Sequence, residues 1–333
     1  MSTSSTLKMS QLNLTAPLVV ITGPTAVGKT EIAIRVAEAV GGEIVSADSR
    51  LFYRGMDIGT AKPTPAERSR VPHHLIDVSE PDQVWSLAVF QHAAVQAIRE
   101  IHARDRLPFL VGGTGQFIHS VVQGWTLPPQ APDLALRASL QRWADAIGPE
   151  GLHQRLALLD PEAAVNIDSR NVRRTIRALE VIFRTGQRFS TQRQQVGSPY
   201  SLLIIGLKRP RAELYQRIDQ RIQAMLDAGF VDEVRGLLER GYSPDLPTLS
   251  AIGYREMVAY LRGRMTLEEA VMQMKRLTRR FVRHQGAWFG EDDPGIHWLE
   301  AGPETEFQIE ALIRDPGAWT LPGTLKDVEA RSK

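Results

Sequence analysis

The stretch Gly23-Pro24-Thr25-Ala26-Val27-Gly28-Lys29-Thr30 decides the fold, because it matches the pattern G-x-x-x-x-G-K-[ST] of a phosphate-binding loop. The preceding residues 18–22 are apolar and β-branched, which predicts a buried strand. Residues 31–40 have the apolar spacing of a helix, and Gly41-Gly42 stops it. This strand–loop–helix setting favours a polyphosphate-binding loop over an ordinary glycine-rich turn.

The residue types of this loop suit a polyphosphate ligand. Backbone N–H groups and the start of the following helix attract the anion. Lys29 adds a positive charge, and the hydroxyl of Thr30 can bind a Mg²⁺ ion shared with the phosphates. We therefore expect every residue of the loop to line the phosphate site, with Mg²⁺ as the cofactor.

Composition excludes several classes of protein. The 333 residues are 43% hydrophobic and 23% charged, which is typical of a globular protein with a large core in one or two domains. There is no cysteine, so disulfides and Cys-bearing zinc sites are excluded. No apolar run approaches the roughly 18 residues that span a bilayer. We expect no membrane contact and a cytoplasmic location, with residues 1–16 a loose tail rather than a signal peptide.

Positive charge is concentrated in two runs, although the net charge is only +2. Residues 170–193 contain seven arginines and one acid, Glu180, and residues 275–283 contain five basic residues and no acid. Such runs suggest a polyanionic partner, with a solvated helix face as the open alternative.

The pattern of elements predicts an α/β fold of the P-loop NTPase type, with a parallel sheet flanked by helices. The strand at 42–48 delivers Asp48 to the carboxyl edge of this sheet, where ligands bind. The strand at 108–111 runs into a second glycine-rich turn, 112–115, that lacks an acid. Hydrolytic P-loop enzymes usually hold Mg²⁺ with such an acid, so Asp48 is either that ligand or a base. The other expected strands are 73–77, 202–207 and 296–299.

A proline-rich stretch and a run of helices interrupt this pattern. They predict a catalytic core at 17–122 and 200–313, an α-helical insertion at 123–199, and a second loose tail at 322–333. We expect residues 49–63 to be a loop with short helical turns. The expected helices are 85–103, 136–147, 151–159, 171–185, 211–228, 231–240, 251–262 and 266–289.

These residues together resemble one family, the tRNA dimethylallyltransferases, also called tRNA isopentenyltransferases. The similarity is carried by the phosphate loop, the turn 47–49, residues 53–63 (Tyr-Arg-Gly-Met-Asp-Ile-Gly-Thr-Ala-Lys-Pro) and residues 111–115. Residues 177–181, 252–255 and the basic helix from 279 to Trp288-Phe289 also match, in family order over about 17–300. The lack of cysteine makes the chain resemble the bacterial type, without the zinc-finger extension of eukaryotic members.

The resemblance implies transfer of a dimethylallyl group from dimethylallyl diphosphate to N6 of an adenosine beside the tRNA anticodon. The phosphate loop would then hold the donor's diphosphate. By family position Asp48 is the base, Thr114 donates towards the bridging oxygen, and Arg217 or Arg221 completes the clamp. The implied tRNA anticodon stem-loop contacts are Asp48, Ser49, Arg50, Leu51, Arg137, Arg173, Arg174, Thr175, Ile176, Arg177, Ser250, Ala251, Ile252, Gly253, Tyr254 and Arg255.

Two segments depart from the common family pattern, namely 50–52 and Gln116-Phe117, and both leave the fine specificity open. Three other functions remain open from the residues alone: a P-loop small-molecule kinase or NTPase, a prenyltransferase acting on free adenine nucleotides, and a non-catalytic RNA-binding protein. We expect the protein to act as a monomer.

Overall fold

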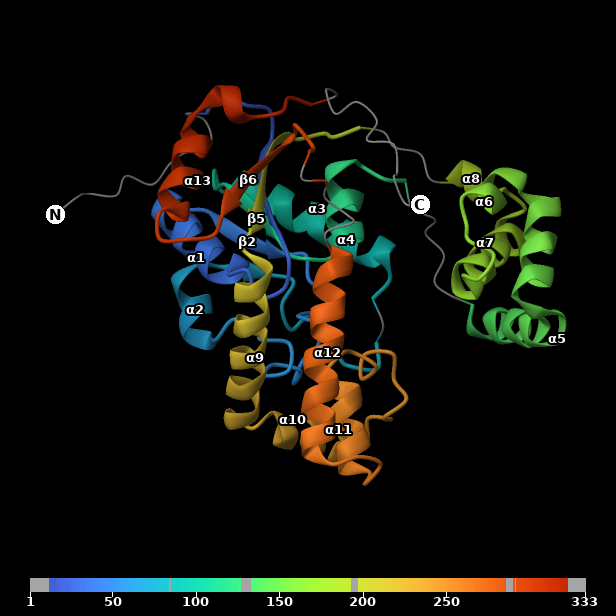
Figure 1. The fold of residues 1–333 in the computed structure, drawn as a ribbon. Coiled ribbons are helices and arrows are strands. Elements are labelled where there is room, and N and C mark those ends of the chain that lie inside the picture. Colours follow the sequence, from blue (N-terminus) through green and yellow to red (C-terminus); the bar gives the residue numbers. More distant parts are fainter. Residues whose placement is uncertain are drawn as a thin grey trace. The chain divides into compact units, whose positions relative to one another are not determined.

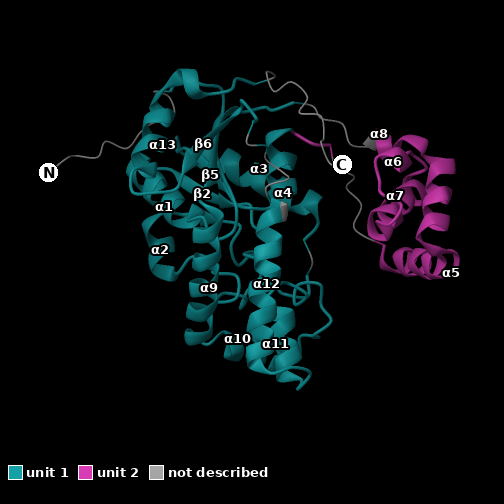
Figure 2. Cartoon of the chain, in the orientation of Figure 1, with its two compact units in different colours: residues 1–123, 197–333 teal, residues 124–196 magenta. Residues whose placement is uncertain are grey.

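The computed structural model describes residues 12–83, 85–126, 133–192, 197–285, 290 and 292–322. They fall into unit 1, from 1–123 and 197–333, and unit 2, from 124–196 (Figure 2). The predicted tails beyond these bounds, most of the proline-rich stretch and the end of the last long helix (286–289) lie outside the described residues. Residues 12–16 are not a loose tail, since Leu12 is buried and the Thr15 carbonyl accepts the Ser201 amide.

Unit 1 is built on a parallel sheet that has, in the described residues, six strands in the order β3-β2-β4-β1-β5-β6 (Figure 1). This confirms the predicted fold class. The strand β3 is shorter than predicted, because Leu75 and Asp77 have positive φ angles. The strands are β1 (Pro17–Thr22), β2 (Glu43–Ser46), β3 (His73–His74), β4 (Pro108–Val111), β5 (Ser201–Lys208) and β6 (Ile296–Glu300).

Helices cover both faces of the sheet, as a parallel sheet requires. The chain moves across the sheet in one direction from β1 to β2 and in the other from β3 to β4, so right-handed crossovers place α1 and α3 on opposite faces. The helices α1 and α13 contact each other, as do α3 and α4. The bounds of these helices, with the short α2, are as follows: α1 (Lys29–Val40), α2 (Pro65–Arg70), α3 (Leu87–Ala103), α4 (Gly115–Val122) and α13 (Thr305–Arg314).

A second group of helices in unit 1 follows β5. The helix α12 contacts both α9 and α11, and α10 contacts α9 and α11. Figure 1 shows these helices extending away from the sheet on the side where α9 begins. They are α9 (Arg211–Asp227), α10 (Phe230–Glu239), α11 (Tyr254–Leu261) and α12 (Leu267–Gln285).

Unit 2 is helical and has its own hydrophobic core, which includes Leu152, Leu156 and Leu179. The predicted helices 136–147 and 151–159 are both present and share the label α5; the non-helical Gly148, with φ of 77°, separates them. The buried carboxylate of Glu180 accepts hydrogen bonds from Arg137 and Arg177. The helices described in this unit are α5 (Leu134–Leu159), α6 (Pro161–Val165), α7 (Val172–Thr185) and α8 (Phe189–Gln192).

The loop 53–63 is fixed by one carboxylate from another part of unit 1. Glu233, in the first turn of α10, accepts the amides of Asp57, Ile58 and Gly59 at 2.8, 2.6 and 3.2 Å. It also accepts the hydroxyl of Tyr254 at 2.6 Å. The predicted loop is therefore held to α10 and α11 by hydrogen bonds to one side chain.

The substitution Glu233→Ala removes all four of these bonds and leaves backbone amides without an acceptor. We expect it to lower the free energy of unfolding by about 2–4 kcal/mol. Chemical denaturation monitored by circular dichroism measures this, with the exposed Glu239→Ala of the same helix as the control. Equal losses in the two variants would show that the carboxylate does not hold the loop.

Candidate active site

The candidate site lies where four parallel strands end. The phosphate loop follows β1, Asp48 follows β2, the turn 112–114 follows β4, and Arg209 follows β5. These strands are neighbours in the sheet, so their carboxyl ends bring segments distant in sequence to one edge. A Cβ atom on Gly112 would lie 2.4 Å from the Ala47 carbonyl, so this close approach of the β2 and β4 ends requires glycine.

The phosphate loop has the backbone of an anion site. Gly28 begins α1 in a left-handed conformation with φ of 110°, and Ala26 has φ of 68°. The amide of Val27 donates to Pro24 within the loop, and that of Thr25 donates to Gln285. The amides of Ala26, Gly28, Lys29 and Thr30 make no hydrogen bond within the described part of the chain. These amides are therefore available to an anion at the start of the helix.

Lys29 lies folded over its own loop. Its Nζ atom donates to the carbonyls of Gly23 and Pro24, both at 2.9 Å. Burial of the ammonium group lowers the pKa of Lys29 to about 8; the nearby Asp48 opposes this shift, and Arg221 adds to it. A buried cation of this kind gains stability from a bound anion.

Three arginines lie near the loop, and they differ in the groups that they contact. Arg209 and Arg217 donate through Nε to the carbonyls of Val27 and Ala26, each at 2.8 Å. Arg221 donates to the Thr60 carbonyl at 3.3 Å and lines the cavity next to the loop. Burial lowers the pKa of Arg221. Sequence reasoning missed Arg209, although it follows a buried strand at the edge where ligands bind.

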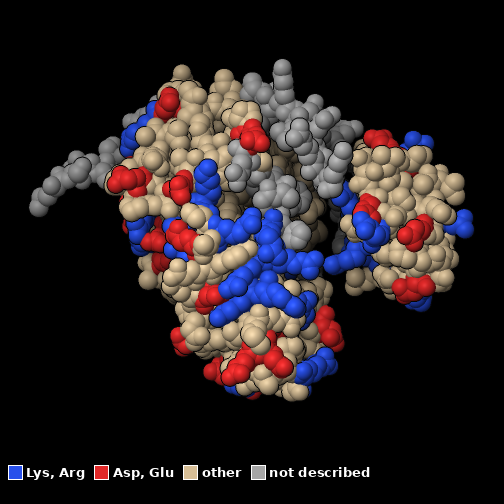
Figure 3. Space-filling view, in the orientation of Figure 1, with Lys and Arg blue, Asp and Glu red and all other residues tan. Residues whose placement is uncertain are grey.

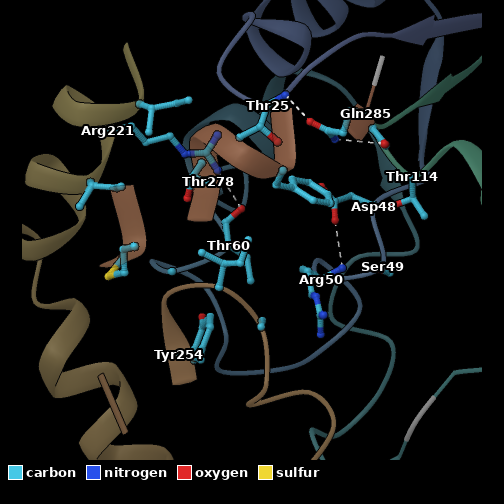
Figure 4. Close-up of a pocket in the computed structure, with 18 of the residues that line it drawn as sticks. Thr25, Asp48, Ser49, Arg50, Thr60, Thr114, Arg221, Tyr254, Thr278 and Gln285 are labelled. Atoms are coloured by element: carbon cyan, nitrogen blue, oxygen red, sulfur yellow. Dashed lines mark hydrogen bonds between the residues drawn. The ribbon is translucent and has the colours of Figure 1, made fainter. Parts of the chain in front are cut away.

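This cavity has a volume of about 440 Å³ and joins polar and apolar walls (Figure 4). The predicted catalytic residues Asp48, Thr114 and Arg221 all line it, whereas Arg217 does not. Of the predicted RNA contacts outside the insertion, Ser49, Arg50, Ala251, Ile252 and Tyr254 also line it. The apolar wall consists of Ile218, Ile222, Met225, Met274 and Phe281.

Asp48 and Thr114 are both free to face a ligand. Asp48 accepts the amide of Arg50 with Oδ1 at 3.0 Å, while its Oδ2 accepts no hydrogen bond from the described residues. The carboxylate therefore caps a turn and still has an available oxygen. Thr114 precedes α4, but its hydroxyl makes no capping hydrogen bond.

The two departures from the common family sequence meet in one aromatic cluster. The rings of Phe52 and Phe117 stack with their centroids 5.9 Å apart, and Phe90 stacks on Phe117 at 4.3 Å. Phe52 and Phe117 are buried, and only Gln116 of the second segment lines the cavity. The aromatic residues at these positions therefore contribute to the core behind the site.

The other predicted RNA contacts differ in exposure. Arg173 and Arg174 are exposed on α7, whereas the side chains of Thr175 and Ile176 are buried in unit 2, so an RNA contact by these two stays a prediction. Arg137 and Arg177 pair with Glu180 at 2.9 and 2.6 Å. Elsewhere, Ser250 and Arg255 are exposed, Leu51 is half-buried and Gly253 is buried.

Basic side chains gather on the face of unit 1 that carries α9 and α12 (Figure 3). On α12, Arg276, Arg280 and Arg283 are exposed. Arg279 is tied to Asp219 of α9 at 2.6 Å. The predicted basic face of this helix is therefore present, with one of its charges neutralised. Within the described residues, no helix combines the length and apolarity needed to cross a bilayer.

Comparison with known proteins identifies the family. A model of the IPP transferase family matches residues 51–292, and one of the isopentenyl transferase family matches residues 16–79. The tRNA dimethylallyltransferase of Roseiflexus sp. (strain RS-1) is 56% identical over 82% of this chain and 90% of its own. The chain belongs to the tRNA dimethylallyltransferase family. A second such relative, from Roseiflexus castenholzii, is 54% identical over 90% of this chain and 97% of its own.

Solved structures of the family share this fold. The tRNA isopentenylpyrophosphate transferase of Bacillus halodurans is 42% identical, with a TM-score of 0.66 over 90% of this chain and 95% of its own. A eukaryotic dimethylallyltransferase, whose structures capture it acting on tRNA, is 25% identical with a TM-score of 0.71, over 89% of this chain and 76% of its own. Membership of the tRNA dimethylallyltransferase family makes this protein a transferase.

The lowered pKa of Lys29 predicts the pH dependence of anion binding. Below about pH 8 the ammonium is charged, and above it the free protein loses this charge. We expect the affinity for inorganic pyrophosphate to fall as the pH rises from 7 to 9.5, measured by isothermal titration calorimetry. The variant Lys29→Arg, which stays charged, is the control: pyrophosphate itself loses a proton over this range, and this variant records that contribution alone. Parallel profiles for the variant and the unmodified protein would contradict the assignment of Lys29.

Proposed function

We propose that this protein transfers a dimethylallyl group from dimethylallyl diphosphate to N6 of an adenosine next to the anticodon of tRNA. The C–O bond of the donor breaks, an N–C bond forms, diphosphate leaves, and the N6 proton passes to a base. The observation that carries this proposal is that one cavity is lined by Asp48, Thr114, Arg221 and, from the phosphate loop, Thr25. Family membership supports the same reaction.

The phosphate loop suits the donor end of the reaction. Four amides of the loop lack a partner within the described residues, and Lys29 and Arg221 add positive charge beside them. Negative charge grows on the departing diphosphate, so these groups stabilise the transition state more than the donor itself. Thr114 lies across the cavity on the β4 turn, where its free hydroxyl can donate to the bridging oxygen.

The apolar wall of the cavity suits the five-carbon part of the donor. Ile218, Ile222 and Met225 are buried side chains of α9, on the helix that also carries Arg217 and Arg221. One helix can therefore hold the allylic chain with its apolar face while its arginines support the diphosphate end. A dry wall also keeps water away from the allylic cation that develops as the C–O bond breaks.

Asp48 is the proposed base. The amino group of adenine is a weak nucleophile, because its lone pair is delocalised into the ring. A carboxylate that accepts the proton during attack assists this step by about 10²–10⁴-fold. The Oδ2 atom of Asp48 is available for this role, while the bond from the Arg50 amide to Oδ1 fixes the carboxylate.

Mg²⁺ fits the residues at the start of α1. Thr30 is exposed and its hydroxyl makes no hydrogen bond within the described residues. The described residues contain no cluster of three or more His, Asp or Glu side chains. Mg²⁺ nevertheless needs only one or two protein ligands when phosphate oxygens and water complete its shell. We propose that Thr30 and the diphosphate hold the ion, which neutralises charge on the leaving group when bound.

The RNA must bring its adenosine out of the anticodon stack to reach this cavity. Arg50, Ile252 and Tyr254 line the cavity and can contact the displaced base, while exposed Ser250 and Arg255 lie next to them in sequence. In unit 2, we propose that the exposed Arg173 and Arg174 contact RNA phosphates. We propose that the enzyme acts as a monomer.

Incubation with labelled dimethylallyl diphosphate tests the function directly. Unmodified tRNA, AMP and ATP are offered as acceptors in parallel reactions. We expect label to enter tRNA alone. Label in AMP or ATP would indicate a prenyltransferase of free nucleotides, and phosphate release from ATP without any label transfer would indicate a P-loop kinase or NTPase.

The substitution Asp48→Asn tests the base. It keeps an acceptor for the Arg50 amide but removes the group that takes the proton, so we expect turnover to fall by about 10²–10⁴-fold. Pyrophosphate affinity at pH 6.5, where Lys29 stays charged, should change little. The exposed Asp245→Asn serves as the control. Near-normal turnover of Asp48→Asn would remove Asp48 as the base.

A further inference from the structure

Gln285, the last described residue of α12, joins two loops of the candidate site. Its Oε1 atom accepts the amide of Thr25 in the phosphate loop at 2.8 Å. Its Nε2 atom donates to the carbonyl of Gly113, in the turn after β4, at 3.1 Å. Figure 4 shows Gln285 between Thr25 and Thr114 at the edge of the cavity. One side-chain amide thus connects the loop proposed to hold the diphosphate with the turn that carries Thr114.

The geometry at Gly113 shows how closely these groups approach one another. A Cβ atom at this glycine would lie 2.6 Å from Nε2 of Gln285 and 3.6 Å from Nζ of Lys29. The side chains of Gln285 and Lys29 therefore converge on the same turn. Glutamine suits this bridge because its amide both accepts and donates, whereas a carboxylate only accepts and an ammonium only donates.

The bridge does not compete with the proposed diphosphate. Gln285 takes the amide of Thr25, and Pro24 takes that of Val27. The amides without a partner in the described residues lie elsewhere in the loop, at Ala26 and at the start of α1. The bridge can therefore persist while the anion binds.

The helix that carries Gln285 also carries exposed cations. Arg280 and Arg283 lie five and two residues before it and are exposed. Arg279 fixes the same helix to α9 through Asp219. A polyanion bound to these arginines would therefore contact the same helix that, through Gln285, holds the phosphate loop and the Thr114 turn.

We propose that Gln285 is a positioning residue that sets the spacing between the phosphate loop and the Thr114 turn, and that it couples RNA binding on α12 to diphosphate binding. The inference rests on the proposed function, because it takes RNA and diphosphate as the two ligands. RNA bound to α12 pre-orders the two loops, so each ligand raises the affinity of the other by the same factor.

A binding cycle without turnover tests this coupling. Calorimetry measures the affinity for inorganic pyrophosphate with Mg²⁺, in the presence and absence of an unmodified anticodon stem-loop RNA. For the unmodified protein we expect RNA to tighten pyrophosphate binding by about fivefold or more. The variant Gln285→Met has a side chain of similar size without the two hydrogen bonds, and we expect its factor to fall to about one.

Two further variants separate coupling from folding. Gln285→Glu keeps the acceptor for Thr25 but places a negative charge beside the diphosphate, so pyrophosphate should bind it more weakly than Gln285→Met. The control Gln273→Met, on the same helix but outside the cavity lining, should keep the full coupling factor. Melting temperatures identify a variant that has lost its fold. In that case the coupling factor is taken from whichever of Gln285→Glu and Gln285→Met remains folded.

Either of two results would overturn the inference: no coupling in the unmodified protein, or unchanged coupling in folded Gln285→Met or Gln285→Glu. Failure of the proposed function would give a different result, because the unmodified protein would then transfer no label to tRNA.

Discussion

The contact between the half-buried Lys29 and the carbonyls of its own loop is the interaction on which the site depends. The ammonium group lies against the carbonyls of Gly23 and Pro24, where desolvation lowers its pKa to about 8. Two other features of the loop also favour an anion. Its left-handed backbone leaves several amides without a partner in the described residues. Arg217 of α9 and Arg209, which follows β5, donate to its carbonyls. A polyphosphate satisfies these groups together.

The chemistry follows from what the sheet places opposite this cation. Asp48 follows β2 and Thr114 lies after β4, and these two strands are adjacent in the sheet. A carboxylate close to a lysine would ordinarily become only an ion-pair partner. Here Lys29 donates to backbone carbonyls and Asp48 keeps an oxygen available, so the cation can hold a leaving group while the carboxylate accepts a proton. This division of roles suits group transfer.

Local patterns were enough to predict most elements of the fold and several residues of the site. The phosphate loop, Asp48 and Thr114 are each marked by a strand that ends beside them. The helices α2, α4, α6, α8 and α13 were not predicted: α4 begins inside a glycine-rich turn, and α2, α6 and α8 have at most six residues each, too few to show a helical spacing of apolar residues. The burial of Thr175 and Ile176 could have been found, because Ile176 and Leu179 share the inward face of α7. Gln285 could not be found, because Thr25 is 260 residues away and only tertiary packing brings them together.

The central claim is that the Lys29 loop holds the diphosphate of a prenyl donor while Asp48 meets the adenosine. A crystal structure with a non-reactive thio analogue of dimethylallyl diphosphate and an anticodon stem-loop RNA tests it most directly. We predict that the diphosphate contacts the amides of residues 28–30 and that N6 of an extruded adenine lies within hydrogen-bond distance of Asp48 Oδ2. Diphosphate bound elsewhere, or Asp48 bound to a metal ion with no space for a purine beside it, would contradict the account.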